Sequence, residues 1–482
     1  QRQMCIRDRT NTMAAIVTKD FRNNNALQFY ESFSEAAKTT YYLFVGRPQP
    51  WSATTGGGTD AAPPTPLDNV QDPYRYYRDM QAAKILGTGD RQYAIPRHNW
   101  ATGIIYDMYR ADYGSSVNSA VVQTEAGGID MFATSTKMYV LSSANNVYKC
   151  MWNNSGGNST VEPTGTSTSE FTTADDYVWK YMYTLDTTQI TNFMTTDFIA
   201  VSTNATVAAA AVKGSVGHYI VANGGAGYTN GTYATQTLRG DGTGATFTVV
   251  VASGAVSTVT AVAVGGGATQ ASQYTFADCN VNAVSGIGTP STDAIIVPVI
   301  SPPGGHGSNA VEELGGFYIM TNTTIAGTAG SGDFVVDQDF RRIAVVKDPF
   351  NYGTTTIATA DTLGALKSVT FAASPTPGTF VNDEVITGGT SGAKGLVVDW
   401  ESSTRVLKYI QTEWTGIDTN KDIKAFAASE VVTGAGGATG TVSAVNNPEI
   451  EYYSGQVIYA ENRAPITRAS DQTENILSLI HI

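Results

Sequence analysis

Short runs of β-branched and aromatic residues, separated by glycine-rich turns, recur along this chain of 482 residues. Residues 247–251, Phe-Thr-Val-Val-Val, form one such run, and residues 224–231 form one of the turns. β-Branched and aromatic side chains favour strands, while glycine supplies the positive φ angles of tight turns. With 49 glycines, 25 tyrosines and 15% charged residues, the sequence predicts a mainly β protein, a multi-layer β-sandwich core with short helices.

Two segments differ from the rest in their high glycine and threonine content. Residues 205–290 predict a small antiparallel β module, because their strands are separated by glycine turns. Residues 366–446 contain an internal repeat, in which Phe-x-x-x-Glu-Val-(Ile/Val)-Thr-Gly occurs at 380–388 and again at 426–434. Because a solenoid needs about three repeats or more, two copies favour a duplicated β-hairpin unit within one small module.

The remaining chain carries both helical and strand patterns. Apolar residues recur at helical spacing over residues 26–33, and Asn23 or Asn24 could cap the start of that helix. A Gly/Pro-rich loop is expected at 54–66. Over residues 177–183, Tyr, Trp, Tyr and Tyr alternate with Val, Lys and Met, which predicts a strand with one row of aromatic side chains on one face.

Charge and composition exclude several classes of partner. The net charge of −13 and the absence of basic clusters argue against binding to nucleic acid, which requires Lys and Arg patches. No apolar run reaches the roughly 18 residues of a membrane span, and no secretory leader is evident. Outside the N-terminal stretch, Cys150 and Cys279 lack a partner pattern, so we expect two buried, reduced thiols.

No arrangement of residues predicts catalysis or a cofactor. His98, His218 and His306 lack the close, matched Cys/His spacing of a zinc site. His306 lies in a Pro/Gly-rich loop and could act as a general base, but no nucleophile motif flanks it, so a structural loop is favoured. The adjacent carboxylates at 175–176 and 312–313 would point to opposite faces of a strand. We therefore expect no enzyme, no metal and no cofactor.

Six short blocks resemble, in the same order, the baseplate wedge subunit of T-even-type contractile-tailed phages, the dimeric component called gene product eight. They lie at residues 15–30, 44–52 (Phe-Val-Gly-Arg-Pro-Gln-Pro-Trp-Ser), 94–100 (Ala-Ile-Pro-Arg-His-Asn-Trp), 176–181 (Asp-Tyr-Val-Trp-Lys-Tyr), 339–349 and 455–474. The chain departs from the family pattern at Asp176, where the family has Gly. Residues 205–300 and 355–446 do not match, and they are longer than the family's linkers there.

The resemblance implies a mechanical function. It implies a homodimer that binds other baseplate wedge and tail proteins in the virion tail baseplate, assembled in the host cytoplasm, without catalysis or a cofactor. The two inserted β modules would make this a cyanophage-like version. The expected segments are a wedge core in three parts (10–204, 291–365 and 447–476), two inserted modules (205–290 and 366–446) and two terminal stretches (1–9 and 477–482).

One short DNA sequence, read on its two strands, can encode both terminal stretches. Residues 4–8 can be encoded by ATG TGT ATA AGA GAC, and the reverse complement of a slightly longer version encodes residues 477–482. This DNA sequence resembles a transposase adapter used to make sequencing libraries. We therefore expect 1–9 and 477–482 to be translated adapter, extended and exposed.

Large aromatic and polar side chains near turns are the candidate interface residues, because aromatics and arginine carry many binding hot spots. Residues 461–463, Glu-Asn-Arg, precede Pro465 and predict a loop after an apolar strand, in which Arg463 could give a bidentate contact to a neighbouring subunit. The candidates are Arg47, Trp51, Arg97, Trp100, Tyr459, Glu461, Asn462 and Arg463.

Two other functional classes stay open at this point. A host-binding adhesin or tail-fibre component would use the Gly/Thr-rich modules to hold surface glycans. A virion polysaccharide hydrolase would need two carboxylates about 5–10 Å apart in a cleft, and these could come from distant positions in the sequence.

Overall fold

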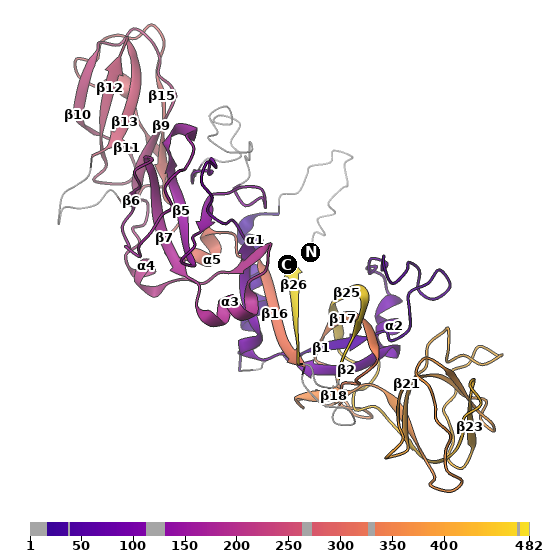
Figure 1. Ribbon diagram of the computed structural model, residues 1–482. Helices are drawn as coiled ribbons and strands as arrows, with labels where there is room; N and C mark the ends of the chain where they lie inside the picture. The colour runs from indigo at the N-terminus through magenta and orange to yellow at the C-terminus, as the bar shows by residue number, and fades with distance from the viewer. Residues whose placement is uncertain are drawn as a thin grey trace, which may run out of the picture. The chain divides into compact units, whose positions relative to one another are not determined.

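The computed structural model describes residues 17–36, 39–111, 131–262, 272–325, 333–469 and 473–481. Strands dominate over short helices and are distributed among several sheets, which confirms the predicted mainly β class (Figure 1). The chain divides into two compact units. The first consists mainly of Gln92–Met320, and the second combines Phe29–Arg91 with Thr321–Ile480.

The helices are short. The α-helices are α1 (Lys19–Glu31), α2 (Asp72–Arg78), α3 (Thr187–Phe193), α4 (Ala205–Ala209) and α5 (Ala310–Glu313), and the 3-10 turns are η1 (Thr88–Asp90), η3 (Asn154–Gly156) and η4 (Val281–Ala283). The predicted cap of α1 was wrong, because the helix begins before Asn23. The Thr18 hydroxyl instead accepts a hydrogen bond from the Phe21 N–H at 3.2 Å. Ala26 is buried as expected, whereas Leu27 is 41% exposed.

A four-stranded sheet organises the first unit. Its order is β4 (Tyr139–Leu141), β5 (Asn146–Asn153), β7 (Tyr177–Thr184) and β6 (Phe171–Thr172), and β3 (Arg91–Pro96) pairs separately with β8 (Phe198–Ala200). Strand β7 contains the predicted row of aromatic residues, and all four are buried. Lys180 and Met182 on the opposite face are buried too, so this strand is covered on both sides.

Residues 216–300 form a lobe with a hydrophobic core of its own. Its strands are β9 (Val216–Asn223), β10 (Gly231–Thr237), β11 (Arg239–Gly240), β12 (Thr246–Ala252), β13 (Ala255–Ala261), β14 (Ala277–Asp278) and β15 (Ile295–Ile300). All pairings given for these strands are antiparallel, as the sequence predicts. Val216 in β9 lies opposite Ile300 in β15, so the two ends of the lobe are adjacent. This supports an inserted module, which stays a prediction.

A five-stranded antiparallel sheet organises the second unit. Its order is β18 (Thr362–Gly364), β2 (Met80–Ile85), β1 (Tyr41–Gly46), β17 (Asp339–Lys347) and β25 (Gln456–Thr467). Alternate residues of β1 enter different hydrophobic clusters, because successive side chains of a strand point to opposite faces. Leu43 and Val45 pack in one cluster, whereas Tyr42 and Phe44 pack in another. The sheet is therefore buried on both faces.

The internal repeat lies in a closed six-stranded barrel. The strands follow the order β19 (Lys367–Phe371), β22 (Val406–Ile410), β21 (Lys394–Glu401), β20 (Val385–Gly388), β23 (Val431–Gly434) and β24 (Thr439–Asn446). Each repeat copy forms an antiparallel hairpin, β20–β21 or β23–β24, as predicted. The two copies pair through β20 and β23, with Ile386 opposite Gly434. The phenylalanines of both copies, Phe380 and Phe426, fill the barrel interior.

The C-terminal part forms two strands in the second unit. The predicted loop at Glu461–Arg463 was wrong, because β25 continues through these residues to Thr467. Pro465 is accommodated where the β17–β25 register shifts, at a position that requires no ladder N–H.

Strand β26 (Glu474–His481) follows, next to β16 (Tyr318–Ile325). Ser478 and Ile480 are buried, so the expectation that 477–482 is exposed was wrong for these two residues. The adapter origin of this stretch stays a prediction, and residues 1–9 lie outside the described residues.

Candidate functional site

A buried arginine follows β1 and lies between tryptophan rings. The guanidinium carbon of Arg47 is 3.9 Å from the ring centroid of Trp51 and 5.0 Å from that of Trp414. Its Nη2 donates a hydrogen bond to the Pro50 carbonyl oxygen at 3.2 Å. Burial lowers the pKa of Arg47 to about 10, although the Asp79 carboxylate partly offsets the shift. Arg47 remains a cation at neutral pH, stabilised by aromatic faces and backbone carbonyls.

A second arginine forms a buried ion pair. Arg342 Nη1 on β17 is 2.8 Å from both carboxylate oxygens of Asp79, and both side chains are almost fully buried. Burial raises the pKa of Asp79, while Arg342 and Arg47 oppose that shift. Arg342 Nε also donates to Asn462 Oδ1 at 3.0 Å, and Asn462 Nδ2 donates to the Pro64 carbonyl oxygen at 2.8 Å. Asn462, which lies on β25, thus connects β17 with the Gly/Pro-rich loop at 54–66.

A third arginine holds that loop in place. Arg341 Nε and Nη2 donate to the two carboxylate oxygens of Asp60, at 2.9 and 3.0 Å, and Nη2 also reaches Asp339 at 2.8 Å. The hydrogen bond from Arg341 is the largest cause of the lowered pKa of Asp60. Asp60 also accepts the Trp51 backbone N–H at 2.8 Å. The predicted loop is therefore fixed against the sheet by charged hydrogen bonds.

The tail strand completes this arrangement. The Trp51 indole N–H donates to the Arg463 carbonyl oxygen at 3.2 Å. The Arg463 guanidinium in turn donates to Glu461 Oε2 at 3.0 Å, and the Tyr459 hydroxyl donates to the same oxygen at 2.9 Å. The side chains of Arg463 and Glu461 remain 39% and 33% exposed. A partner could therefore still reach these two charges, and also that of Asp60, whose side chain is 33% exposed.

Three of the sequence blocks therefore meet in one place, which we call the arginine cluster: Arg47, Trp51, Asp60, Asp79, Arg341, Arg342, Trp414, Asn462 and Arg463. Sequence reasoning missed Asp60, Asp79, Arg341, Arg342 and Trp414 as members. Two adjacent arginines within the apolar run of β17 were the available signal, because buried charges require partners. Their partners come from distant segments, and a single sequence cannot show that pairing.

The other two candidate residues lie in the first unit. Arg97 Nη1 donates to the Thr195 carbonyl oxygen at 2.8 Å, and its Nε donates to Asn99 Oδ1 at 2.9 Å. The Trp100 indole N–H donates to Ser159 Oγ at 3.1 Å. Both side chains are half-buried. A role in an interface stays a prediction for all eight candidates.

His306 is buried beside an ion pair. Its Nδ1 lies 3.1 Å from both Lys149 Nζ and Glu313 Oε1, and Lys149 pairs directly with Glu313. Burial lowers the pKa of His306, and Lys149 lowers it further. Burial alone would raise the pKa of Glu313, but Lys149 and His306 outweigh it and hold that pKa below its ordinary value. The Gly307 N–H donates to Glu313 Oε2 at 2.6 Å, so Glu313 anchors the loop that contains His306.

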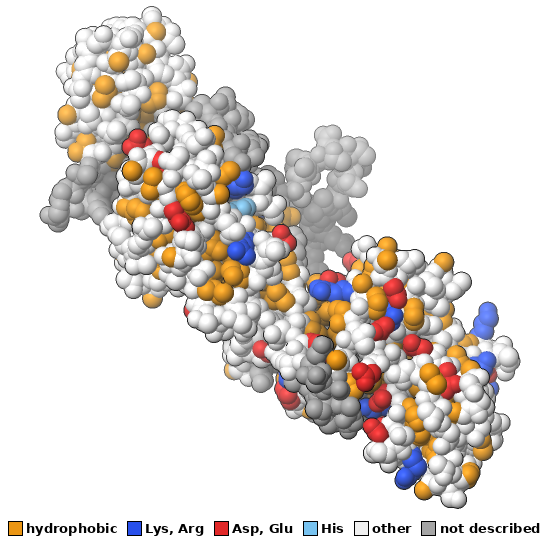
Figure 2. Space-filling model, viewed as in Figure 1, with side chains coloured by type: hydrophobic (Ala, Val, Ile, Leu, Met, Phe, Trp, Pro, Cys, Tyr) orange, Lys and Arg blue, Asp and Glu red, His pale blue; other side chains and the backbone are white. Residues whose placement is uncertain are grey.

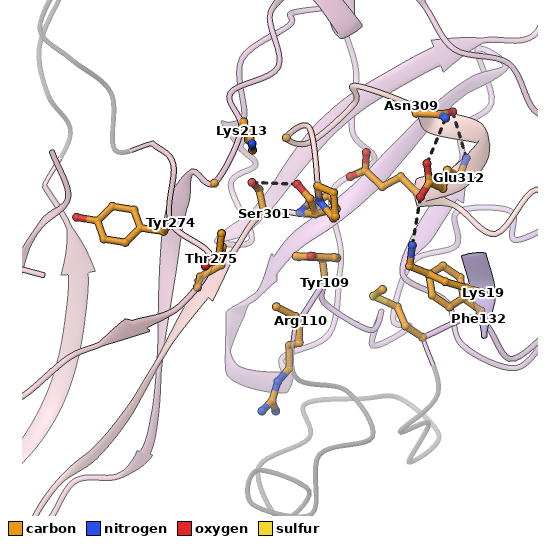
Figure 3. A pocket seen from close by; sticks show the side chains of 18 residues that line it. Lys19, Tyr109, Arg110, Phe132, Lys213, Tyr274, Thr275, Ser301, Asn309 and Glu312 are labelled. Atoms are coloured by element: carbon orange, nitrogen blue, oxygen red, sulfur yellow. Dashed lines mark hydrogen bonds and ion pairs between the residues drawn. The ribbon is translucent and has the colours of Figure 1, made fainter. Parts of the chain in front are cut away.

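A pocket of about 400 Å³ lies next to this ion pair (Figure 3). Tyr109 and Ser301 line it, and the Tyr109 ring lies 3.6 Å from Lys149 Nζ. At one side Lys19 Nζ is 3.3 Å from Glu312 Oε1. The Ser301 hydroxyl accepts the Ser215 N–H at 3.1 Å, and its other hydrogen bonds among the described residues go to backbone carbonyl oxygens, not to His306. These contacts support a structural loop.

The described residues contain no group of three or more His, Cys, Asp or Glu side chains arranged to hold a metal ion. Within the same residues, no helix is both long and apolar enough to cross a membrane. Cys150 and Cys279 are buried and form no disulfide, as predicted.

Two comparisons relate the chain to known proteins. Residues 15–240 match the family model described as Bacteriophage T4, Gp8. Over 203 residues the chain is 27% identical to the baseplate wedge protein gp8 of Enterobacteria phage T4, a match that covers 39% of this chain and 60% of the relative. This chain is similar to Gp8. The family match contains the blocks at 15–30, 44–52, 94–100 and 176–181, and it ends before β17 and β25 of the arginine cluster. It extends to residue 240, so the expectation that residues 205–300 do not match was wrong for 205–240.

Proposed function

We propose that this chain is a structural component of a phage tail baseplate wedge and acts by binding neighbouring wedge subunits. The observation that carries the proposal is the similarity of residues 15–240 to Gp8, together with 27% identity to a protein named as a baseplate wedge protein. The chain spans 60% of that relative's length. The binding partners of this chain are therefore part of the proposal and are not assigned from the relative. Its place of action would be the tail baseplate of the virion, after assembly in the host cytoplasm.

The second unit has properties that suit a mechanical role in a larger assembly. Its sheet is packed on both faces, and the arginine cluster connects β1, β17 and β25 through charged hydrogen bonds. Buried polar networks rigidify the segments that they join. Such a unit presents its exposed side chains at fixed positions.

Self-association is a further part of the proposal. We infer a homodimer, and a stable one should bury more than about 1,000 Å² in total. Other wedge and tail proteins would bind to the remaining surfaces. Glu461 and Arg463 are the contact residues that we propose, because both lie on β25, at the edge of the five-stranded sheet, and stay partly exposed.

The test combines sedimentation with binding. The purified chain should sediment as a dimer, and it should retain baseplate wedge proteins encoded by the same phage when they are co-expressed. Arg463→Ala should weaken that binding by about tenfold or more, because charged hydrogen bonds contribute roughly 1.5–3 kcal/mol. Arg239→Ala is the matched control, since this arginine is 61% exposed and pairs with Asp278 elsewhere on the surface. A monomer that retains no wedge protein would overturn the proposal.

A further inference from the structure

An open groove of about 730 Å³ lies in the first unit, between the lobe of residues 216–300 and the end of β5. Strands β9 and β13 supply one side, and Trp152 with the following turn η3 supplies the other. Neither the arginine cluster nor the proposed baseplate contacts use this groove. It therefore requires a separate explanation.

Two of the aromatic rings that line the groove, those of Trp152 and His218, are stacked. Trp152, half-buried near the end of β5, lies nearly parallel to the His218 ring, with an interplanar angle of 10° and 6.2 Å between centroids. His218 Nε2 is 3.2 Å from Glu170 Oε2, which fixes the orientation of the imidazole. Trp152 is paired with Val178 across the β5–β7 ladder. The two rings are thus held in place by a sheet and a hydrogen-bonding contact before any ligand binds.

Hydroxyl and amide groups surround these rings. Ser257, Thr258 and Thr260 on β13 line the groove and are exposed. Asn154 and Ser155 line it from η3, with φ angles of 47° and 55°. Left-handed backbone at two successive non-glycine residues costs free energy, and such residues concentrate at binding sites. The groove therefore combines an aromatic surface with groups that both donate and accept hydrogen bonds.

Charge is the third property of the groove. Its described lining contains no Lys, Arg, Asp or Glu. The visible face of the lobe around β10, β12 and β13 is likewise mostly uncharged, with hydrophobic and neutral polar side chains (Figure 2). A site for phosphate or another anion would require basic side chains. The lining instead suits a neutral ligand that has both apolar C–H faces and many hydroxyl groups.

We propose that this groove binds a neutral oligosaccharide. One pyranose ring would pack its C–H face on Trp152, because aromatic rings bury a large apolar area in a fixed geometry. The sugar hydroxyls would exchange hydrogen bonds with Thr258, Thr260 and Asn154, which place polar groups around an apolar surface as ligand sites commonly do. The inference is independent of the baseplate proposal, since it uses no residue of the arginine cluster.

The test uses the full chain and defined sugars. A glycan array carrying neutral and sulfated oligosaccharides identifies the class, and calorimetry with cellohexaose, laminarihexaose and isomaltohexaose measures affinity. Neutral sugars should bind, and Trp152→Ala should weaken binding by about tenfold through loss of ring packing. Thr258→Arg should abolish it, because the larger charged side chain enters the groove from an exposed position. Thermal melts of each variant establish that the fold is retained.

Phe276→Ala is the matched control, since this aromatic residue is 64% exposed and belongs to the same lobe. It should leave the affinity unchanged. Absence of binding to every neutral sugar up to millimolar concentration would overturn the inference. Binding of sulfated sugars alone, or neutral binding that survives Thr258→Arg in a folded protein, would overturn it as well.

Discussion

Glu384 and Glu430 each bind the turn that follows the other's strand in the barrel. Glu384 Oε2 accepts the Gly436 N–H at 2.8 Å, after β23, whereas Glu430 Oε2 accepts the Ser391 N–H at 2.9 Å, after β20. Each carboxylate also accepts the N–H three residues before it in its own copy, at 2.9 and 2.6 Å. The repeated glutamate therefore links the two hairpins reciprocally.

The glycine that ends each copy of the repeat makes room for this exchange. A Cβ atom at Gly388 would lie 2.7 Å from Glu430 Oε2, and one at Gly434 would lie 2.6 Å from Glu384 Oε2. Phenylalanine fills the interior, glutamate links the copies and glycine leaves space for the glutamate. These three positions of the repeat thus have separate physical roles.

The first prediction concerns the loss of this link. Glu430→Gln should lower the free energy of unfolding by about 1–3 kcal/mol, because it removes charged hydrogen bonds from a carboxylate that is 3% exposed. Urea denaturation of the full chain, followed by circular dichroism, measures the change. Asp422→Asn, at an exposed position in a loop of the same barrel, is the control and should have little effect. Equal stability of Glu430→Gln and the parent chain would contradict the role assigned to the carboxylate.

The second prediction concerns pH. Burial alone would raise the pKa of Glu430, but the N–H groups of Ser391, Ala427 and Thr390 and the Ser391 hydroxyl outweigh it. The pKa of Glu430 therefore lies below the ordinary value for a glutamate. A carboxyl whose pKa is depressed in the folded state stabilises the fold above its unfolded pKa. That contribution is lost as the pH falls through the folded pKa. The stability difference between the parent chain and Glu430→Gln should therefore be constant at pH 6–7 and shrink below about pH 4.5. Denaturation curves at intervals from pH 7 to pH 3 measure it, and a difference that grows on acidification would reverse the sign.

The repeat shows how far sequence reasoning reaches in this chain. Each copy predicts a local hairpin, since its strands are neighbours along the chain, and both hairpins are present. Closure into a barrel depends on β19, which pairs with both β22 and β24. Those contacts join residues far apart in the sequence, and no local pattern specifies them. The mainly β class was therefore predictable and the barrel was not.

The candidate site, too, could be predicted from the sequence only in part. Arg47, Trp51, Asn462 and Arg463 were singled out separately, and the structure brings them together. The residues around Pro465 were predicted as a loop, because proline and charged side chains are typical of turns. Tertiary pairing overrides that preference, since β25 hydrogen-bonds to β17 on either side of its register shift.

The third prediction concerns the buried ion pair of the arginine cluster. Arg342→Met should destabilise the second unit by about 3–5 kcal/mol, because the buried Asp79 carboxylate would lose its ion-pair partner and both hydrogen bonds from Arg342. The double variant Arg342→Met with Asp79→Asn should recover part of that loss. Arg239→Ala, which breaks an exposed pair with Asp278, should change stability by no more than about 1 kcal/mol. Chemical denaturation of all three variants provides the comparison, and equal effects for the buried and the exposed pairs would refute the assignment.

The fourth prediction concerns the barrel as an inserted module. Ser368 in β19 lies opposite Asn446 in β24, so the chain enters and leaves the barrel at adjacent positions. Insertions are tolerated where their ends lie close together. Replacing residues 366–446 by a short Gly/Ser bridge should leave a soluble chain with its five-stranded sheet intact. The deletion does remove the Arg75–Glu413 ion pair and the contact of Arg47 with Trp414, so a lower midpoint of thermal unfolding is expected.

The reciprocal experiment expresses residues 366–446 alone. This fragment should fold, because the barrel core is drawn from residues within it, including Val369, Phe380 and Val442.

Deletion of residues 456–467 is the control for the full chain, since it removes β25 and leaves Arg342 and Trp51 without their partners on that strand. That deletion should prevent folding of the second unit, whereas the barrel deletion should not. Circular dichroism and size-exclusion chromatography distinguish the outcomes. If the barrel deletion abolished folding as completely as the loss of β25, the barrel would be part of the core on which the sheet depends.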